Sequence, residues 1–190
     1  MGWDKSSLLP TWDINKQGLL EWDQHINSLA TGIKCADKVT TVSETYMAQL
    51  KYQSAGLESL FENEQAKCLG ILNGIDTELW DPYTDPMVKY PYNQETVLSG
   101  KQKNKEALCS KYNLDINKPL IVFIGRLVGE KAADVLPGAI QHALDKTNGG
   151  ANFFVIGAGD TAVESALNYL KQLYPENYNC WIGYDEAIGH

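Results

Sequence analysis

Two cations lie just beyond a short apolar run in the middle of the chain. Residues 119–124 are apolar and rich in β-branched types, and Gly125, Arg126 and, slightly later, Lys131 follow them. Such a run is typical of a strand that is buried on both faces of a parallel sheet. Ligands of α/β sheets bind beyond the carboxyl ends of the strands. An arginine and a lysine at that position could therefore bind the two phosphates of a diphosphate.

Two later apolar runs, residues 153–156 and 180–182, are also followed by residues that suit a nucleotide. A nucleotide site needs cations for the phosphates, bare backbone and an aromatic side chain within one cleft. Because parallel strands end at the same edge of a sheet, we expect the turns after these strands to lie close to Arg126. The glycines and the tyrosine in these turns are Gly157, Gly159, Gly183 and Tyr184.

The turn after the second of these runs allows another interpretation. Residues 157–162 fit the pattern G-x-G-x-x-A between a strand and a helix, which is the fingerprint of dinucleotide-binding proteins. Asp185, at the end of the next strand, could then hydrogen-bond a ribose, as in flavin or nicotinamide oxidoreductases. Against this, the fingerprint usually lies in the first βα unit of its domain, whereas a full βα unit precedes it here. The interpretation also leaves Arg126 and Lys131 without a role.

Hydrophobic periodicity predicts the elements that position these turns. One helix is expected from about Asp134, with Asp134 as its N-cap and Pro137 in its first turn. A second is expected from Thr161, in a capping-box sequence, to about Tyr174. Residues 119–190 thus follow the order β-α-β-α-β, and right-handed crossovers between such strands give a parallel sheet.

The earlier part of the chain carries weaker signals. Apolar residues recur at helical spacing over residues 16–36, which predicts one long helix. Short β-rich runs at residues 38–42 and 68–72 predict two strands, and Ser43 is expected to cap a helix after the first. Residues 101–112 predict a basic helix whose lysines form a solvated face.

Composition limits the classes of function. The net charge of −8 argues against a nucleic-acid or anionic-membrane partner, so any anion site must depend on a few placed cations. The four cysteines have no metal-ligand spacing and no CxxC pair, which indicates reduced thiols in a cytosolic protein. No apolar stretch has the length of a signal core or a membrane span.

An ordered set of motifs runs through most of the chain. It comprises residues 36–43, residues 72–76 with Trp80, residues 125–127 with Lys131, residues 157–160 and residues 182–187. As a set, these motifs resemble bacterial glycogen synthase and plant starch synthase, of glycosyltransferase family 5. The resemblance implies the GT-B fold, an α/β architecture of two Rossmann-like domains that face a cleft.

The resemblance also implies an activity. The family transfers glucose from ADP-glucose to the non-reducing end of an α-1,4-glucan with retention of configuration. It uses no cofactor and requires no metal, and the residues leave UDP-glucose open as a donor. A cytoplasmic location in a bacterium, or a plastid in a plant, would follow.

Two residues match the family's diphosphate contacts. Arg126 and Lys131 would act as the catalytic pair, because their charge would stabilise the leaving ADP as the glycosidic bond breaks. The chain departs from the family at two positions, each next to one of these cations. Ala132 replaces the usual glycine after the lysine, which would limit how closely this loop approaches the phosphates. Gly125 replaces the usual serine before the arginine, which is a mild change.

Other positions of the family's donor site are matched as well. The family has an asparagine near the donor, glycines that the nucleotide approaches, and a Gly-Tyr pair beside the adenine. The residues that match or adjoin these positions are Asn73, Gly74, Gly157, Gly159, Gly183, Tyr184 and Asp185.

The resemblance predicts the domain organisation too. Residues 1–76 are expected to end an acceptor-side Rossmann-like domain, residues 77–100 to form a linker, and residues 101–190 to begin the nucleotide-sugar-binding domain. The family's Lys-Gly-Gly loop, its sugar-facing histidine and its Glu-Pro-Cys-Gly segment do not occur. We therefore expect an internal piece that does not turn over alone, since a transferase needs both walls of its cleft. A nucleotide-binding module without chemistry is the remaining alternative.

Overall fold

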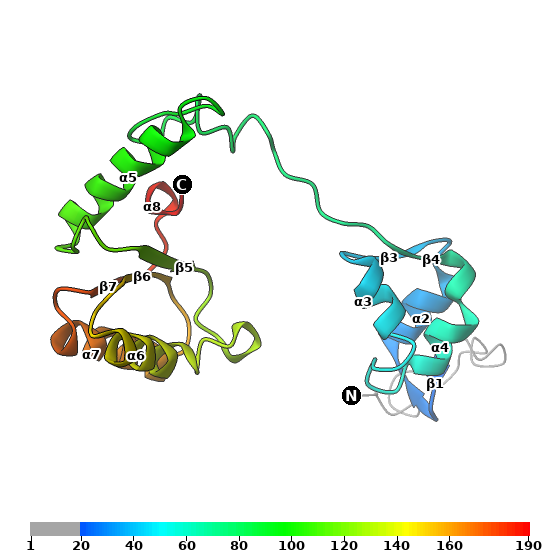
Figure 1. The fold of residues 1–190 in the computed structure, drawn as a ribbon. Coiled ribbons are helices and arrows are strands. Elements are labelled where there is room, and N and C mark those ends of the chain that lie inside the picture. Colours follow the sequence, from blue (N-terminus) through cyan, green and yellow to red (C-terminus); the bar gives the residue numbers. More distant parts are fainter. Residues whose placement is uncertain (1–19) are drawn as a thin grey trace. The chain divides into compact units, whose positions relative to one another are not determined.

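The computed structural model describes residues 20–190. Contacts within the chain form two compact units, Met1–Ile75 and Asp76–His190 (Figure 1). The division falls within an exposed stretch, residues 71–80. The expectations for residues 1–19, including the start of the long helix, lie outside the described residues.

The long helix expected over residues 16–36 is wrong for most of its described part. Strands β1 (Glu21–Trp22) and β2 (His25–Ile26) form a small antiparallel hairpin, and helix α2 occupies only Ser28–Cys35. The two residues of the hairpin turn, Asp23 and Gln24, have φ of 49° and 62°, so the chain reverses where a helix would continue. Asn27 then caps α2 by accepting a hydrogen bond from the Ala30 N–H.

The rest of the first unit contains the expected elements. Strands β3 (Val39–Thr41) and β4 (Cys68–Gly70) pair in parallel, and helices α3 (Glu44–Gln49), α4 (Glu58–Asn63) and the 3-10 turn η2 (Gln65–Lys67) lie between them in sequence. Ser43 caps α3 through the Tyr46 N–H, as predicted. The core of this unit consists of Ala30, Ile33, Met47, Leu50, Leu57, Leu60 and Phe61.

The segment from residue 76 to residue 96 contains no helix or strand. Aspartate side chains form its turns: the Asp76 carboxylate accepts from the Glu78 and Leu79 N–H groups, and the Asp85 carboxylate accepts from the Met87 N–H. Within the second unit, paired hydrogen bonds between Tyr90 and Asn104 join this segment to the helix that follows it.

The second unit is built on a three-stranded parallel sheet. Strands β5 (Leu120–Ile124), β6 (Asn152–Gly157) and β7 (Tyr178–Ile182) lie in that order. Helices α6 (Leu136–Thr147) and α7 (Thr161–Leu173) cover one face, and α5 (Val97–Lys111) with the short α8 (Glu186–Gly189) lies over the other (Figure 1). The predicted β-α-β-α-β order and the parallel sheet are confirmed.

Three local predictions for this unit are wrong. Strand β5 was expected to be buried on both faces, but Ile121, Val122 and Ile124 are 49%, 43% and 56% exposed because β5 is an edge strand. Helix α6 begins at Leu136, and no side chain caps it, so Asp134 is not its N-cap. Helix α7 is capped one residue earlier than expected, as described below for the site.

Candidate functional site

The carboxyl ends of β5, β6 and β7 open into a cleft of about 410 Å³. This volume lies in the range of small-molecule pockets. The structure brings together in its lining five of the residues singled out from the sequence, one or more from the turn after each strand: Arg126, Gly157, Gly183, Tyr184 and Asp185.

Two other expected contacts in the second unit, Lys131 and Gly159, do not line this cleft. Lys131 lies in the short 3-10 turn η3 (Gly129–Lys131), with an exposed side chain. Gly159 lies in the turn between β6 and α7, where it forms a bridge to Leu127. Asn73 and Gly74 belong to the first unit and are exposed there.

Arg126 presents a largely exposed guanidinium. Its side chain is 70% exposed and forms an ion pair with Glu130, which is 61% exposed. An exposed pair of this kind contributes about 0–1 kcal/mol to stability. The weak pair leaves the two parallel N–H donors of the arginine accessible to an anion with suitably spaced oxygens.

The glycines after β6 are required by packing within the protein. A Cβ at Gly157 would lie 2.0 Å from the Gly125 carbonyl oxygen, and a Cβ at Gly159 would lie 2.3 Å from the Leu127 carbonyl oxygen. The Leu127 N–H donates to the Ala158 carbonyl at 2.9 Å, so the segment that carries Arg126 lies directly against this turn. The glycines thus fix the position of Arg126.

The N-terminus of α7 is already occupied by the chain's own carboxylates. Asp160 accepts hydrogen bonds from the Ala162 and Val163 N–H groups, and Glu164 accepts one from the Gly159 N–H at 2.8 Å. In the dinucleotide fingerprint these are the donors that a pyrophosphate uses. A phosphate would meet two negative charges here, which argues physically against the dinucleotide interpretation.

The turn after β7 gives the cleft an aromatic side chain. Gly183 has φ of +144°, a conformation that L-residues rarely adopt. The next residue, Tyr184, is 87% exposed, so its ring is available for stacking. Asp185 faces α8, where its carboxylate accepts from the Ile188 N–H at 3.1 Å, and one of its oxygens is therefore already used.

The backbone conformation at Ala132 explains why glycine suits the position after the lysine. Its backbone has φ 53° and ψ 29°, in the left-handed region. An L-residue with a Cβ is strained there by about 1–2 kcal/mol, whereas glycine is not. The substitution thus affects the backbone of the loop that follows Lys131.

Sequence reasoning gave no role at the site to three residues that build one wall of the cleft, although Trp80 belongs to one of the motifs. Trp80 and His190 both line it, and their rings stack with centroids 4.0 Å apart and planes 9° apart. His190 Nδ1 forms a hydrogen bond with Asp85 Oδ2, and both side chains are almost fully buried. The bond to His190 has the largest effect in lowering the pKa of Asp85, and the hydrogen bond from the Met87 N–H has the next largest. The two partners are 105 residues apart, so no local pattern signals them.

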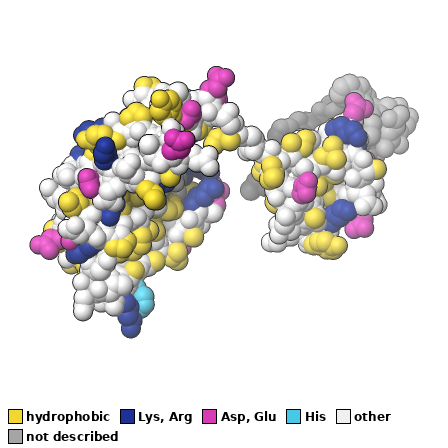
Figure 2. Space-filling view, turned by 45° about the horizontal axis from the view of Figure 1, so that its top comes forward, with side chains coloured by type: hydrophobic (Ala, Val, Ile, Leu, Met, Phe, Trp, Pro, Cys, Tyr) yellow, Lys and Arg dark blue, Asp and Glu magenta, His cyan; other side chains and the backbone are white. Residues whose placement is uncertain are grey.

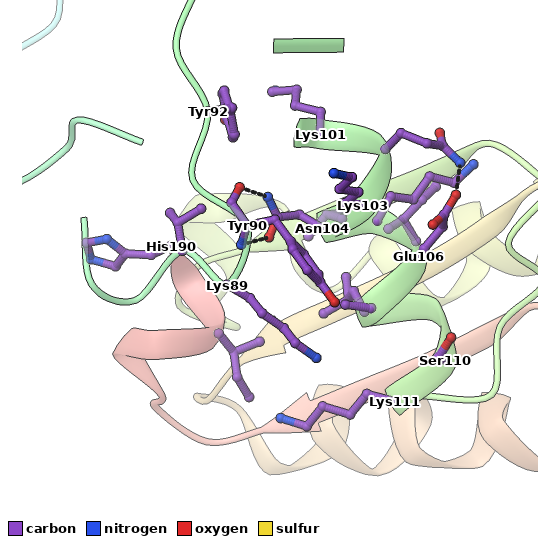
Figure 3. A pocket seen from close by; sticks show the side chains of 18 of the residues that line it. Lys89, Tyr90, Tyr92, Lys101, Lys103, Asn104, Glu106, Ser110, Lys111 and His190 are labelled. Atoms are coloured by element: carbon purple, nitrogen blue, oxygen red, sulfur yellow. Dashed lines mark hydrogen bonds between the residues drawn. The ribbon is translucent and has the colours of Figure 1, made fainter. Parts of the chain in front are cut away.

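A second, wider depression of about 1310 Å³ lies between α5 and the edge strand β5 (Figure 3). Lysines surround it, and its lining is apolar at the partly buried Leu120 and the exposed Val122. Hydrophobic side chains also reach the surface of both units in the space-filling view (Figure 2). The lysines, which include Lys101, Lys103 and Lys111, point in different directions, so they do not converge on one ligand (Figure 3).

Within residues 20–190, no group of three or more His, Cys, Asp or Glu side chains is arranged to hold a metal ion. Over the same residues, no helix has both the length and the apolar character needed to cross a membrane.

Comparisons with known proteins agree with the motifs. A family model described as the starch synthase catalytic domain matches residues 3–63. A glycogen synthase of Flavobacterium johnsoniae is 48% identical over 189 residues, which are 100% of this chain and 40% of that protein. A glycogen synthase of Histophilus somni is 35% identical over 188 residues, 96% of this chain and 38% of that protein.

A solved structure gives the same result. The catalytic domain of starch synthase IV from Arabidopsis thaliana, bound to ADP and acarbose, has a TM-score of 0.77 at 31% identity. The match covers 90% of this chain and 35% of that one. The resemblance and the GT-B-type α/β fold expected from the sequence are confirmed, and the chain spans about two fifths of the length of these relatives.

Proposed function

We propose, from this relationship to the glycogen and starch synthases, that the chain is part of a glucosyltransferase whose second unit binds the nucleotide of a sugar-nucleotide donor. The carrying observation is the cleft itself, where an exposed arginine, a glycine turn and an exposed tyrosine meet at the carboxyl edge of one parallel sheet. The arginine suits the diphosphate, the glycine turn lets the nucleotide approach the backbone, and the tyrosine suits the adenine.

In this proposal Arg126 binds the donor diphosphate, together with Lys131 from the following turn. As the bond between glucose and ADP breaks, negative charge grows on the phosphate oxygens, and fixed cations stabilise it. Tyr184 stacks on the adenine, with Gly183 and Asp185 beside it. Gly157 and Gly159 hold the arginine turn in place.

The acceptor is an α-1,4-glucan and glucose is transferred with retention, since the relatives are glycogen and starch synthases. We propose ADP-glucose as the donor, because the solved starch synthase structure was determined with ADP and acarbose. No cofactor is needed, and the enzyme would act in the cytoplasm of a bacterium or in a plastid. Nothing among these relatives favours an oxidoreductase.

Titration calorimetry of the 190-residue chain tests the nucleotide site. ADP should bind, and NAD and FAD should not. Arg126→Ala should weaken ADP binding about 10- to 100-fold, because hydrogen bonds to charged groups contribute about 1.5–3 kcal/mol. Lys146→Ala is the matched control, since Lys146 is an exposed cation in the last turn of α6. Binding of NAD in place of ADP would overturn the proposal.

A chimera tests the transferase activity. This chain would replace the matching segment of the Flavobacterium johnsoniae glycogen synthase, and glucose transfer from ADP-glucose to glycogen would be measured. We expect an active chimera in which Arg126→Ala removes about 2–4 kcal/mol of transition-state stabilisation, the usual scale for one preorganised donor. A loss of activity under threefold would contradict the role given to Arg126.

A further inference from the structure

One buried contact helps to hold the wall of the cleft beside Tyr184. Asp85 Oδ2 pairs with His190 Nδ1, and the two side chains are only 4% and 2% exposed. The opposite nitrogen of the ring, Nε2, is buried without a hydrogen-bond partner. The aspartate is therefore the only hydrogen-bond partner of this imidazole among the described residues.

This contact joins helix α8 (Glu186–Gly189) to the segment that carries Asp85. Three contacts tie the helix to the rest of the unit: Ile188 packs against the core cluster below α5, and His190 both pairs with Asp85 and stacks on Trp80. Loss of Asp85 would remove the one hydrogen bond among these contacts.

The same helix determines where Tyr184 stands. The Asp185 carboxylate caps α8, and the Gly189 N–H donates to the Asp185 carbonyl, so the residue after Tyr184 is part of the helix. Because the Tyr184 ring is 87% exposed, its direction depends on the backbone on either side of it. Trp80 is stacked on His190, so the contact between His190 and Asp85 also positions the indole ring.

We propose that Asp85 and His190 are positioning residues of the nucleotide cleft: together they anchor α8 and Trp80, and so hold Tyr184 where it can stack on the purine ring. This rests on the proposed function for the stacking step only. The anchoring itself is a property of the unliganded chain. Neither residue touches the nucleotide in this account, and both act through the backbone of residues 183–189 and the indole ring of Trp80.

Binding of ADP to the 190-residue chain tests the proposal. Asp85→Ala should raise the ADP dissociation constant about tenfold. Tyr184→Ala should raise it by a similar factor, and the double variant should bind no more weakly than Tyr184→Ala alone. Such non-additivity is expected when one residue acts through another. Fully additive effects would show a general loss of structure and would overturn the proposal.

Two further variants separate positioning from packing. In the same segment, the Asp81 carboxylate accepts from the Tyr83 N–H, as the Asp85 carboxylate accepts from the Met87 N–H. Asp81→Ala removes this turn hydrogen bond and should change ADP binding less than twofold. Asp85→Asn can still accept from the Met87 N–H and donate its amide to His190 Nδ1, so it should bind ADP within threefold of the original chain. An Asp85→Ala effect no larger than that of Asp81→Ala would contradict the proposal.

If Asp85→Ala does not fold, as judged by near-UV circular dichroism, His190→Ala takes its place with the same expected pattern. If the original chain does not bind ADP, the proposed function fails, and amide hydrogen exchange decides the anchoring separately. Exchange over residues 183–189 should then be faster in Asp85→Ala or His190→Ala than in Asp81→Ala. Unchanged exchange in this segment would overturn the anchoring.

Discussion

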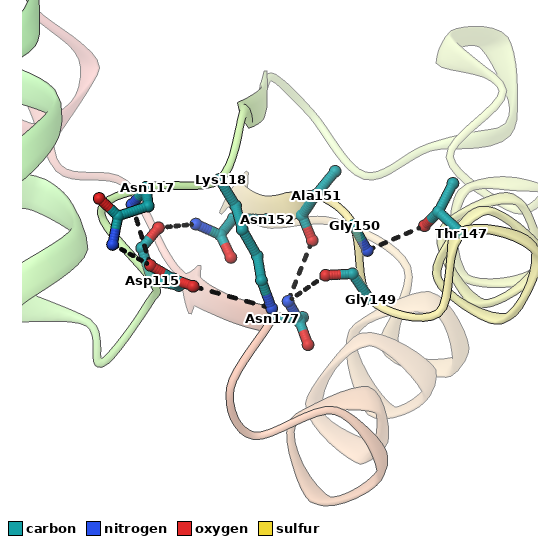
Figure 4. A network of polar contacts seen from close by, with 9 residues as sticks. All are labelled: Asp115, Asn117, Lys118, Thr147, Gly149, Gly150, Ala151, Asn152 and Asn177. Atoms are coloured by element: carbon teal, nitrogen blue, oxygen red, sulfur yellow. Dashed lines mark hydrogen bonds and ion pairs between the residues drawn. The ribbon is translucent and has the colours of Figure 1, made fainter.

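The two ends of the β5-β6-β7 sheet have the same parallel strands and opposite surroundings. At the amino end, asparagine side chains bond the loop carbonyls: Asn152 Nδ2 donates to the Asp115 carbonyl at 2.6 Å, and Asn177 Nδ2 donates to those of Gly149 and Ala151 (Figure 4). These side-chain amides thus satisfy backbone carbonyl groups in the loops that lead into the strands.

At the carboxyl end, side chains do not fill the edge. Glycines follow β6 and β7, the Arg126 and Tyr184 side chains are mostly exposed, and the cleft of about 410 Å³ lies between the turns. At the amino end, polar groups of the chain bond one another. At the carboxyl end, a cation, backbone groups and an aromatic ring remain available to a ligand. We infer that the amino end contributes to stability without contributing to binding, whereas the carboxyl end contributes to both, a difference that can be tested by mutation.

The largest effect is expected from Gly157→Ala, at the carboxyl end. The new methyl group would lie 2.0 Å from the Gly125 carbonyl oxygen, so strand β6 or the arginine turn must move. Overpacking of this severity costs about 3 kcal/mol, and ADP binding should weaken as well because Arg126 shifts. Urea unfolding and calorimetry would measure both. Gly138→Ala, inside α6 with open space around it, should instead stabilise by about 0.5–1 kcal/mol.

The next effect is expected from Asn152→Ala, at the amino end. Asn152 is fully buried and bonds the Asp115 carbonyl, so its loss leaves this partly buried acceptor without its partner and should cost about 1–3 kcal/mol. The ADP dissociation constant of the folded variant should stay within twofold. Asn117→Ala, an exposed asparagine on the same network, serves as control and should cost under about 0.5 kcal/mol. A large change in ADP affinity would break the division between the two ends.

A smaller effect, of opposite sign, is expected from Ala132→Gly beside the carboxyl end. Glycine removes the strain of the left-handed conformation but adds entropy to the unfolded chain, so the net gain in stability should be about 0.5–1 kcal/mol. Thermal melting would measure it. Asn148→Gly is the matched comparison, because asparagine tolerates φ of +48° better than alanine and should gain less. Equal gains at both positions would show that strain at Ala132 is not the cause.

The smallest effect is expected from Glu130→Gln. The substitution removes the carboxylate that pairs with Arg126 and should tighten ADP binding about two- to fivefold, the equivalent of up to about 1 kcal/mol for an exposed pair. The gain should shrink at high salt. Glu62→Gln makes the same charge change on an exposed residue of the first unit and should have no effect on ADP binding. Weaker binding by Glu130→Gln would mean that the glutamate helps to hold the arginine for its ligand.

Much of the second unit could be predicted because its signals are local. The run at β5, the glycine turns and the helix periodicity each lie within one segment of chain, and together they predicted the parallel sheet and the turns that line the cleft. The first unit was harder, since Trp22, Ile26, Leu29 and Ile33 have helical spacing but are divided between a hairpin and a shorter helix. The cap at Asn27 was the signal that could have revealed this boundary.

By itself, the sequence determined the order of the elements in the second unit, the family that the chain resembles and the residue types at the edge of the sheet, because periodicity, turn chemistry and motif order are written along the chain. Only the tertiary structure decided which strand is an edge, why Gly157 must be a glycine, and that Asp85 holds His190. These facts depend on contacts between segments far apart in sequence, whose geometry is set by the packing of the whole unit. No pattern of neighbouring residues records such contacts.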